Sequence, residues 1–471
     1  MRHCDLCIIG SGPGGQKAAI QAAKLGKDVV VVEKMEFVGG VAINTGTIPS
    51  KALREAVLAV TNVRAHAHSD GFRDLDRRDL LRRLTDYCNR VIRAEVDLVR
   101  GHFLSNGIEL VSGHGSFLDP RTVLVSGPRG DEKISADYIL VATGTTPARP
   151  ENIPFDGHNV ITSDDVLRLP YLPRSMIIVG GGVIGTEYAS MLSLLGVRVT
   201  LVEGRKRLLE FVDSEISEAL QYHLRQSGMT LRLGEQVVTI RLIEPTPGAR
   251  VESPMMVEAV LESGKTLRAD CLMYCVGRQG ATAGLNLAAA GLTADARGRI
   301  DVNEHYQTAV PHIYACGDVI GFPALASTSM EQGRLAACHM FGVHAQSFPR
   351  LFPYGIYSIP EISMVGWTEE RLTEEGIPYE AGIAQYREIA RGQLIGDDIG
   401  MLKLLIHQDS RTVLGVHAIG TGATELIHIG QAVMAFNGTA DYFINTVFNY
   451  PTLAECYKVA ALNGLNKLRS V

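Results

Sequence analysis

The sequence predicts an α/β protein with two βαβ units and a third, C-terminal α+β region. The segments CDLCIIGSGPGGQKAAIQAAKLGKDVVVVEK and SMIIVGGGVIGTEYASMLSLLGVRVTLVEG each have the pattern of a strand, a glycine turn, a helix and a second strand. The composition agrees, because 49 glycines against 19 prolines are typical of many tight strand-to-helix turns rather than of disorder.

The composition also limits size and partners. A chain of 471 residues is too long for one hydrophobic core and suits about three or four domains. A net charge of −6 predicts no binding to nucleic acid or to an anionic membrane. No run approaches the roughly 18 to 20 apolar residues that span a bilayer, and the N-terminus enters a strand directly. We therefore expect a cytoplasmic protein without a membrane partner.

The cysteines predict neither a disulfide framework nor a metal site. They are scattered, mostly in apolar runs, at Cys4, Cys7, Cys88, Cys271, Cys275, Cys316, Cys338 and Cys456. Cys4 and Cys7 have the spacing of a redox or metal pair, but they lie on one expected strand. Because side chains alternate along a strand, we expect these two to point to opposite faces.

The remaining elements follow in chain order. Arg77 to Arg100 has helical spacing of apolar residues among many charges, which predicts a long amphipathic helix with a solvated face. Strands are expected at Ile108–Val111 and Thr122–Val125, and the turn in Tyr138–Pro147 indicates a boundary near residue 150. A new pattern begins near residue 346, with strands MLKLLIH and VLGVHAIG before the helix ATELIHIGQAVMAF. The expected segments are 1–150, 151–278, 279–345 and 346–471.

The first glycine turn has the fingerprint of a Rossmann-type dinucleotide site. Gly10, Gly12 and Gly15 follow a strand and open a helix, and Glu33 ends the next strand. The first glycine permits the tight turn, the second lets the backbone approach a pyrophosphate, and the third allows close packing of helix on strand. The helix N-terminus offers N–H groups to the phosphates, and Glu33 can accept hydrogen bonds from a ribose diol.

The second turn repeats the fingerprint, so one chain holds two dinucleotide sites. Its glycines are Gly180, Gly182 and Gly185, and Glu203 takes the place of Glu33. Glu203 favours the 2′-hydroxyl of NAD. The cations Arg205, Lys206 and Arg207 follow it and can offset the negative charge of a 2′-phosphate. We expect a site that accepts both NAD and NADP; the alternative is that these cations only form a solvated loop.

These motifs resemble the family of pyridine nucleotide–disulfide oxidoreductases, flavoproteins that include lipoamide and glutathione reductases. The resemblance covers essentially the whole chain and is carried by GSGPGG with Glu33, GGVAINTGTIPSK, ATGTTP, GGGVIGTE, ACGDVIG with Asp318, and FNYPTLAE. It implies that segments 1–150 and 279–345 bind FAD, that segment 151–278 binds NAD(P), and that segment 346–471 forms a homodimer or a higher homo-oligomer.

The resemblance also assigns site residues. For FAD it implies contacts from Gly10, Gly12, Gly14, Gly15, Glu33, Lys34, Thr47, Lys51, Thr143, Gly144, Gly317 and Asp318, the last holding the ribitol. For NAD(P) it implies Gly180, Gly182, Val183, Gly185, Glu187, Glu203, Arg205 and Gly277. Val183 replaces an aromatic gate, which either frees nicotinamide access or reflects packing alone.

Two departures from the family pattern exclude disulfide chemistry. The redox cysteine pair of the relatives is replaced by Ala42 and Thr47, and the histidine before the terminal Pro-Thr is replaced by Tyr450, five residues before Glu455. Both nucleotide fingerprints are kept. Within the family this combination looks most like the soluble transhydrogenases, although members often retain the first cysteine.

The resemblance implies a ping-pong reaction in which NADPH gives hydride to flavin N5 and NAD then takes it from the same site. Lys51 would stabilise negative charge near N5 and pair with Glu187; otherwise the two are unrelated surface charges. The runner-up activity is an NAD(P)H:quinone reductase of the diaphorase type, which would also lack the dithiol. A non-enzymatic redox sensor is the third hypothesis, and Lys51 with Glu187 speaks against it.

Overall fold

The computed structural model describes residues 2–66, 76–128, 130–245, 255–345 and 351–468. The chain divides into two compact units. The first comprises Met1–Pro150, Thr162–Tyr171 and Val276–Ser347, and the second comprises Glu151–Ile161, Leu172–Cys275 and Phe348–Val471. The four segments expected from the sequence stay a prediction, and the boundary expected at residue 346 falls outside the described residues.

The first unit is built on a sheet with strand order β3-β2-β1-β6-β5-β4, and β17 pairs with β6. Its strands are β1 (Arg2–Ile9), β2 (Val29–Glu33), β3 (Glu109–Ser112), β4 (His114–Asp119), β5 (Thr122–Gly127), β6 (Gly130–Val141) and β17 (Ile313–Ala315). The central pairs are parallel and the β4-β5-β6 pairs antiparallel. The parallel strands therefore end at one edge of the sheet, where ligands bind in open α/β sheets.

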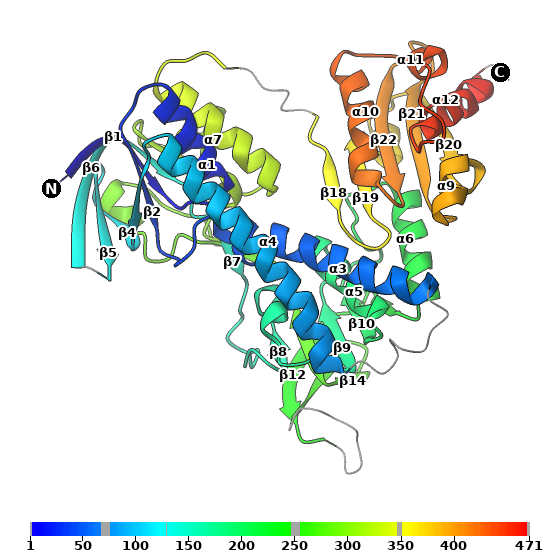
Figure 1. The fold of residues 1–471 in the computed structure, drawn as a ribbon, viewed down its shortest axis with the longest axis horizontal. Coiled ribbons are helices and arrows are strands. Elements are labelled where there is room, and N and C mark those ends of the chain that lie inside the picture. The colour runs from blue at the N-terminus through cyan, green and yellow to red at the C-terminus, as the bar shows by residue number, and fades with distance from the viewer. Residues whose placement is uncertain (1, 67–75, 129, 246–254, 346–350, 469–471) are drawn as a thin grey trace. The chain divides into compact units, whose positions relative to one another are not determined.

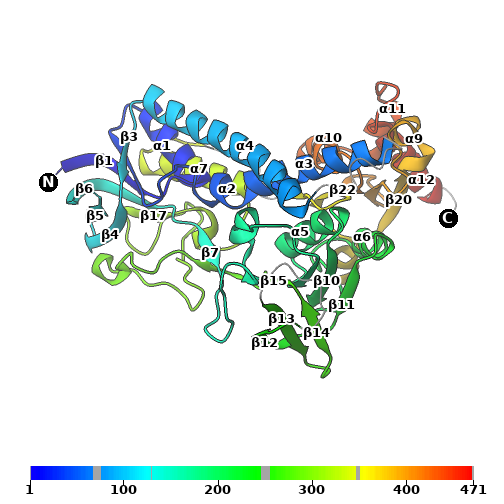
Figure 2. The same ribbon diagram turned by 60° about the horizontal axis from the view of Figure 1, so that its bottom comes forward.

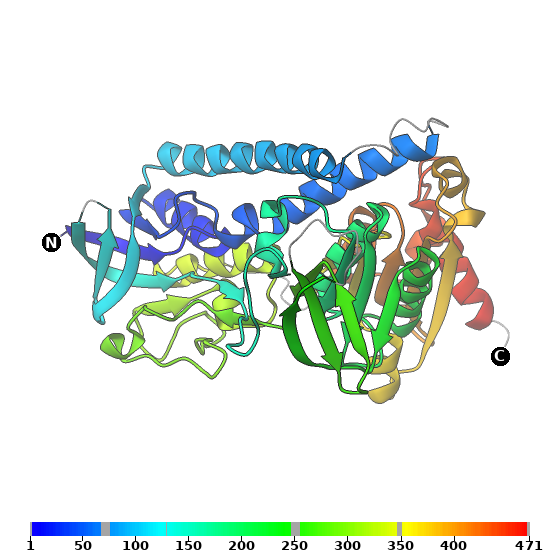
Figure 3. The same cartoon turned by 90° about the horizontal axis from the view of Figure 1, so that it is seen from below.

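The helices of this unit are α1 (Pro13–Lys24), α2 (Gly40–Asn44), α3 (Thr47–His66), α4 (Arg77–Ser105) and α7 (Ala326–Met340), with 3-10 turns η2 (Ser163–Arg168), η3 (Leu287–Ala290) and η4 (Gly317–Ile320). Buried side chains of α1, α2, α4 and α7 share one apolar cluster with β1, β2 and β6. A Cβ on Gly333 would lie 2.0 Å from the carbonyl oxygen of Gly14, so α1 and α7 lie side by side through glycine contacts (Figure 1). The amphipathic helix predicted from Arg77 is α4, which packs on α1, α2 and α3 (Figure 3).

The predicted orientation of the first two cysteines is wrong. Cys4 and Cys7 are both fully buried in the same apolar cluster. The backbone N–H groups of Asp5 and Leu6 both donate to the carbonyl oxygen of Asp28, which interrupts the alternation of β1 between the two cysteines. Both thiols are free, and burial raises the pKa of Cys4 to about 12, so they are inert core residues.

The second unit contains the second βαβ fold. Its five-stranded sheet has the order β11-β10-β9-β15-β8, and neighbouring strands in this order are parallel. The strands are β8 (Val160–Ile161), β9 (Ser175–Val179), β10 (Arg198–Glu203), β11 (Thr230–Leu233) and β15 (Cys271–Tyr274), with helices α5 (Val183–Leu194) and α6 (Ser214–Gln226). An antiparallel sheet of β12 (Val237–Ile243), β13 (Met256–Leu261) and β14 (Thr266–Ala269) shares an apolar core with it (Figure 2).

The C-terminal part of the same unit is an antiparallel sheet with helices packed on it. The strand order is β18-β19-β22-β21-β20. The strands are β18 (Tyr354–Ile356), β19 (Ile362–Gly366), β20 (Tyr379–Gln385), β21 (Met401–His407) and β22 (Val413–Ile419). The helices are α8 (Glu369–Glu374), α9 (Ala390–Ile395), α10 (Ala423–Ala435), α11 (Ala440–Asn445) and α12 (Glu455–Leu468). Within the described chain, no helix has both the length and the apolar character of a membrane span.

Candidate dinucleotide sites

The first glycine turn joins β1 to α1 and leaves space beside the helix N-terminus. Gly10 has φ +109°, and a Cβ there would lie 2.4 Å from the carbonyl oxygen of Ala142. A Cβ on Gly15 would lie 2.1 Å from the carbonyl oxygen of Gly10, so helix and strand pack closely. At Gly12, the N-cap of α1, a Cβ would meet no atom within 4 Å. The turn thus has an open position at the positive end of a helix, where a pyrophosphate can approach the backbone.

Glu33 closes this turn from the end of β2. Its Oε2 accepts hydrogen bonds from the backbone N–H and the hydroxyl of Ser11, at 3.0 and 2.5 Å, and its Oε1 accepts from the backbone N–H of Met35 at 2.8 Å. The Ser11 hydroxyl also accepts from the N–H of Gly39 at 2.9 Å. The carboxylate is therefore fixed at the cleft while one acceptor position on Oε1 is left over.

A cleft at the strand ends gathers most of the expected FAD residues. It is lined by Gly10, Gly12, Gly14, Glu33, Lys34, Thr47, Thr143, Gly144, Gly317 and Asp318. Of the expected residues that the structure describes in this unit, Gly15, Lys51 and Gly277 do not line it. Gly15 faces the strand, and Lys51 on α3 donates from Nζ to the Ser50 hydroxyl at 3.2 Å. Gly277 has φ +85° and accepts a hydrogen bond from the Ala148 N–H.

Several lining residues escaped sequence reasoning. They include Ser11, Asn44, Thr45, His114, Asp164 and Ser329. Ser11 lies inside the glycine fingerprint, and Asn44 and Thr45 lie inside the motif GGVAINTGTIPSK, so their positions were usable signals. His114, Asp164 and Ser329 come from segments without a motif. Burial raises the pKa of the Asp164 carboxyl, with nearby Arg278 opposing it. Cys316 also lines the cleft, and burial raises the pKa of its thiol to about 12, so it stays protonated.

The cleft suits FAD in the chemistry of its donors and acceptors. The hydroxyl oxygens of Thr45 and Thr143 are buried in it without a hydrogen-bond partner in the described chain. Asp318 on η4 accepts from the Thr145 hydroxyl at 3.2 Å, and the Arg278 Nε donates to that hydroxyl at 2.7 Å. Buried polar groups normally have partners, so these hydroxyls and the open Gly12 position indicate a polar ligand with an anionic centre.

The second turn repeats the first in the other unit. Gly180 has φ +105°, a Cβ on Gly185 would lie 1.9 Å from the carbonyl oxygen of Gly180, and a Cβ on Gly182 would meet nothing within 4 Å. Glu203 at the end of β10 accepts from the N–H of Gly181 at 2.6 Å, as Glu33 accepts from Ser11. Val183 is the first residue of α5.

The three cations after Glu203 have different surroundings. The Arg205 guanidinium donates to both oxygens of Glu203, at 2.9 and 3.0 Å. Lys206 is exposed. Arg207 turns elsewhere: its Nη1 lies 3.5 Å from Oε1 of Glu370 and its Nη2 donates to the carbonyl oxygen of Glu210 at 3.3 Å. Arg205 is thus the cation in direct contact with the acid of the fingerprint.

The two expected catalytic residues belong to different units. Lys51 lies in the first unit and Glu187 in the second. Glu187 on α5 is 3% exposed, and its Oε1 accepts the N–H of Tyr357 at 2.9 Å. Their pairing stays a prediction.

The positions of a disulfide reductase's reactive groups carry no thiol. Ala42 on α2 and Thr47 at the start of α3 line the cleft. All eight cysteines are free. Tyr450 is 74% exposed, and Glu455 begins α12. Neither a dithiol nor a histidine base is present at these positions.

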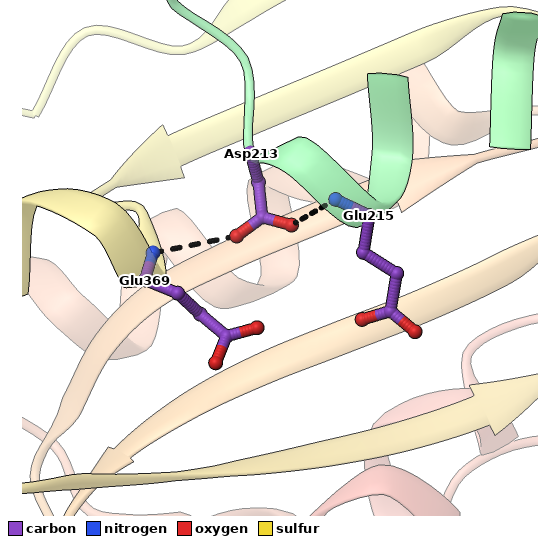
Figure 4. A group of neighbouring side chains, drawn as sticks. All are labelled: Asp213, Glu215 and Glu369. Atoms are coloured by element: carbon purple, nitrogen blue, oxygen red, sulfur yellow. Dashed lines mark hydrogen bonds between the residues drawn. The ribbon is translucent and has the colours of Figure 1, made fainter. Parts of the chain in front are cut away.

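One acidic cluster in the second unit could be mistaken for a metal centre. The carboxylates of Asp213, the N-cap of α6, of Glu215 on α6 and of Glu369 on α8 lie together (Figure 4), the one such group found in the part of the chain that is described. The ammonium group of Lys403 lies 2.9 Å from both Asp213 and Glu215 and also contacts Glu369. The chain therefore supplies its own cation here, and we assign no metal.

Comparison with protein families now identifies the fold. Residues 4–333 match the model described as pyridine nucleotide-disulphide oxidoreductase, and residues 352–461 match the dimerisation domain of the same family. The chain belongs to the pyridine nucleotide-disulphide oxidoreductase family. The predicted fold class is confirmed by this assignment and by the two βαβ folds.

Curated relatives and solved structures of this family match over almost the whole chain. Soluble pyridine nucleotide transhydrogenase of Mycobacterium tuberculosis is 52% identical, covering 100% of this chain and 99% of the relative. The protein of the same name from Colwellia psychrerythraea is 47% identical, covering 98% of each. The HOCl-induced flavoprotein disulfide reductase RclA from Escherichia coli has a TM-score of 0.86 at 26% identity, covering 97% of this chain and 99% of RclA. LpdA from M. tuberculosis, at 24% identity over 98% of this chain and 99% of LpdA, has a TM-score of 0.87 and shares the fold.

Proposed function

We propose that this chain is an FAD-dependent transhydrogenase that catalyses NADPH + NAD⁺ = NADP⁺ + NADH. The observation that carries the proposal is the pair of complete dinucleotide turns in a chain with Ala42 and Thr47 at the dithiol positions. The reaction balances without a further reactant, because one hydride leaves NADPH and one arrives on NAD⁺. The relatives that match over the full length carry the name of this activity.

The first unit's cleft would hold FAD. Bound FAD supplies the atom that accepts a hydride from one nicotinamide and returns it to the other. Gly12 admits the pyrophosphate, Glu33 accepts the adenosine ribose diol, and Asp318 takes the ribitol. The unpartnered hydroxyls of Thr45 and Thr143 would gain acceptors or donors from the ligand.

The second unit's turn would hold both nicotinamide nucleotides in turn. Gly182 leaves room for the pyrophosphate and α5 directs its N-terminus at it. Lys51 would favour negative charge at the hydride position, with Glu187 as its counter-charge. One site for donor and acceptor requires that the first product leave before the second substrate binds, which makes the kinetics ping-pong.

The protein works as a homodimer through the family's dimerisation domain at residues 352–461. Phe436, Val447 and Tyr450 in this region are 83%, 91% and 74% exposed in the single chain, and a second copy would cover such side chains. We place the enzyme in the cytosol, where both nicotinamide pools are available; the relatives are named soluble.

A competition between acceptors tests the activity. Anaerobic enzyme is supplied with NADPH and either a chromogenic NAD analogue or benzoquinone, and lipoamide and glutathione disulfide serve as thiol substrates. We expect parallel lines in double-reciprocal plots, a specificity constant for the NAD analogue at least about tenfold above that for the quinone, and no turnover of either disulfide. If the quinone is instead favoured about tenfold and NAD reduction is barely measurable, the protein is a quinone reductase.

A further inference from the structure

The two fingerprint acids of this chain have the same backbone partners but different side-chain partners. Glu33 and Glu203 each accept a hydrogen bond from the backbone N–H of the second residue of the glycine turn. Each also accepts one from the backbone N–H of the residue two positions after the acid itself. That last residue is Met35 in the first unit and Arg205 in the second. The two sites therefore differ in that a guanidinium contacts Glu203 and none contacts Glu33 from the corresponding position.

In the second unit, the carboxylate of Glu203 has no acceptor position left. Its Oε1 accepts from the backbone N–H and from Nε of Arg205, both at 2.9 Å, and its Oε2 accepts from the Gly181 N–H at 2.6 Å and from Nη2 of Arg205 at 3.0 Å. An ionised carboxylate offers about four lone-pair positions, so all are filled. From the residues that the structure describes, Glu33 accepts three hydrogen bonds, and a ribose diol can bind it without displacing a protein group.

The geometry of the guanidinium makes this difference functional. Arg205 uses one N–H of Nε and one of Nη2 on Glu203, which leaves three of its five N–H groups directed away from the acid. Its side chain is 46% exposed while that of Glu203 is 7% exposed, so Arg205 can move without repacking a core and Glu203 cannot. Burial acts to raise the pKa of the Glu203 carboxyl, but the hydrogen bonds from Arg205 and from the backbone keep this pKa below its ordinary value.

We propose that Arg205 is a resident occupant of the ribose-diol acceptor and thereby sets the preference between NAD and NADP. NAD must displace the guanidinium from Glu203, exchanging two hydrogen bonds between oppositely charged groups for two from neutral hydroxyls to the same carboxylate. NADP instead binds its 2′-phosphate to the outer edge of the guanidinium, which stays on Glu203 and neutralises it. This specificity mechanism rests on the proposed function, because it concerns how one site serves both nucleotides.

The matched variant is R205M, which reproduces the arrangement of the FAD site, where Met35 stands at the corresponding position. The holoenzyme is titrated calorimetrically with 5′-ADP, which carries the diol, and with 2′,5′-ADP, which carries the 2′-phosphate. We expect R205M to bind 5′-ADP more tightly and 2′,5′-ADP more weakly than the unaltered enzyme, so that the ratio of the two dissociation constants changes by about tenfold or more. A residue that only contacts the phosphate would weaken 2′,5′-ADP and leave 5′-ADP unchanged.

Two further variants separate displacement from other effects. R198M removes a cation from the exposed start of β10, at the far end of the strand from Glu203, and should leave both dissociation constants unchanged. In the double variant E203Q/R205M the gain in 5′-ADP affinity should be much smaller, because the ionised acceptor is gone. Melting curves and the flavin spectrum show that each variant is folded.

The proposal is overturned if R205M binds 5′-ADP with unchanged or lower affinity, or if E203Q/R205M keeps the full gain. These titrations involve no hydride transfer. A failure of the transhydrogenase activity would therefore appear in turnover with NADPH and NAD while the binding result stands, and the two failures remain distinguishable.

Discussion

At the scale of single residues, the two glycine turns show which parts of a site a sequence reveals. The roles of Gly10, Gly12 and Gly15 follow from spacing alone, because a side chain at Gly10 or Gly15 would clash with backbone and Gly12 leaves open the space that a ligand needs. The ion-pair partner of Arg207 cannot be predicted from the sequence, because Glu370 lies in the C-terminal region of the second unit and no local pattern connects the two residues. Local constraints were predictable, whereas pairings between distant segments required the structure.

Two alanine substitutions separate the ligand-binding glycine from the structural one. G12A places a methyl group where no protein atom lies within 4 Å, so the fold should be kept while FAD binds more weakly. G15A places it 2.1 Å from the Gly10 carbonyl and should lower the free energy of unfolding by about 1–3 kcal/mol. FAD dissociation constants and denaturant unfolding of the apoprotein measure the two effects. Equal loss of stability in both variants would contradict this division of roles.

At the scale of elements, the strands and helices of the C-terminal region were predictable and their buried charges were not. The runs MLKLLIH and VLGVHAIG form β21 and β22 as expected, because apolar runs bounded by turns are typical of buried strands. Lys403 inside the first run is fully buried, and its three carboxylate partners come from the N-cap and first turn of α6 and from the start of α8. The prediction failed for Cys4 and Cys7 for a similar reason, since the backbone irregularity depends on Asp28, which lies on another segment.

Lys403 should be essential for the stability of the second unit. K403M removes the cation from a group of three carboxylates, of which Asp213 is fully buried, and should lower the free energy of unfolding by about 3–5 kcal/mol. The control K265M makes the same substitution in an exposed pair with Glu235 and should have a much smaller effect. Denaturant unfolding measures both. If the two variants unfold alike, the Lys403 cluster does not hold α6 and α8 on the sheet.

At the scale of the whole molecule, the chain combines two dinucleotide folds with a dimerisation domain and lacks the reactive thiols of its disulfide-reducing relatives. The sequence predicted this combination, because fingerprints and missing cysteines are both local features. The same two folds would serve a quinone reductase equally well up to the first hydride transfer. The discrimination therefore lies in which acceptor takes the hydride in the second half of the reaction.

The most direct test of transhydrogenation is a sequential-mixing stopped-flow experiment under anaerobic conditions. Holoenzyme is first mixed with one equivalent of NADPH, which should bleach the yellow flavin absorbance without a long-wavelength thiolate charge-transfer band. After the NADP formed has been allowed to dissociate, mixing with NAD should restore the flavin absorbance and form one equivalent of NADH, at a rate that accounts for steady-state turnover. If NAD fails to restore the absorbance while benzoquinone restores it at once, the central claim is contradicted.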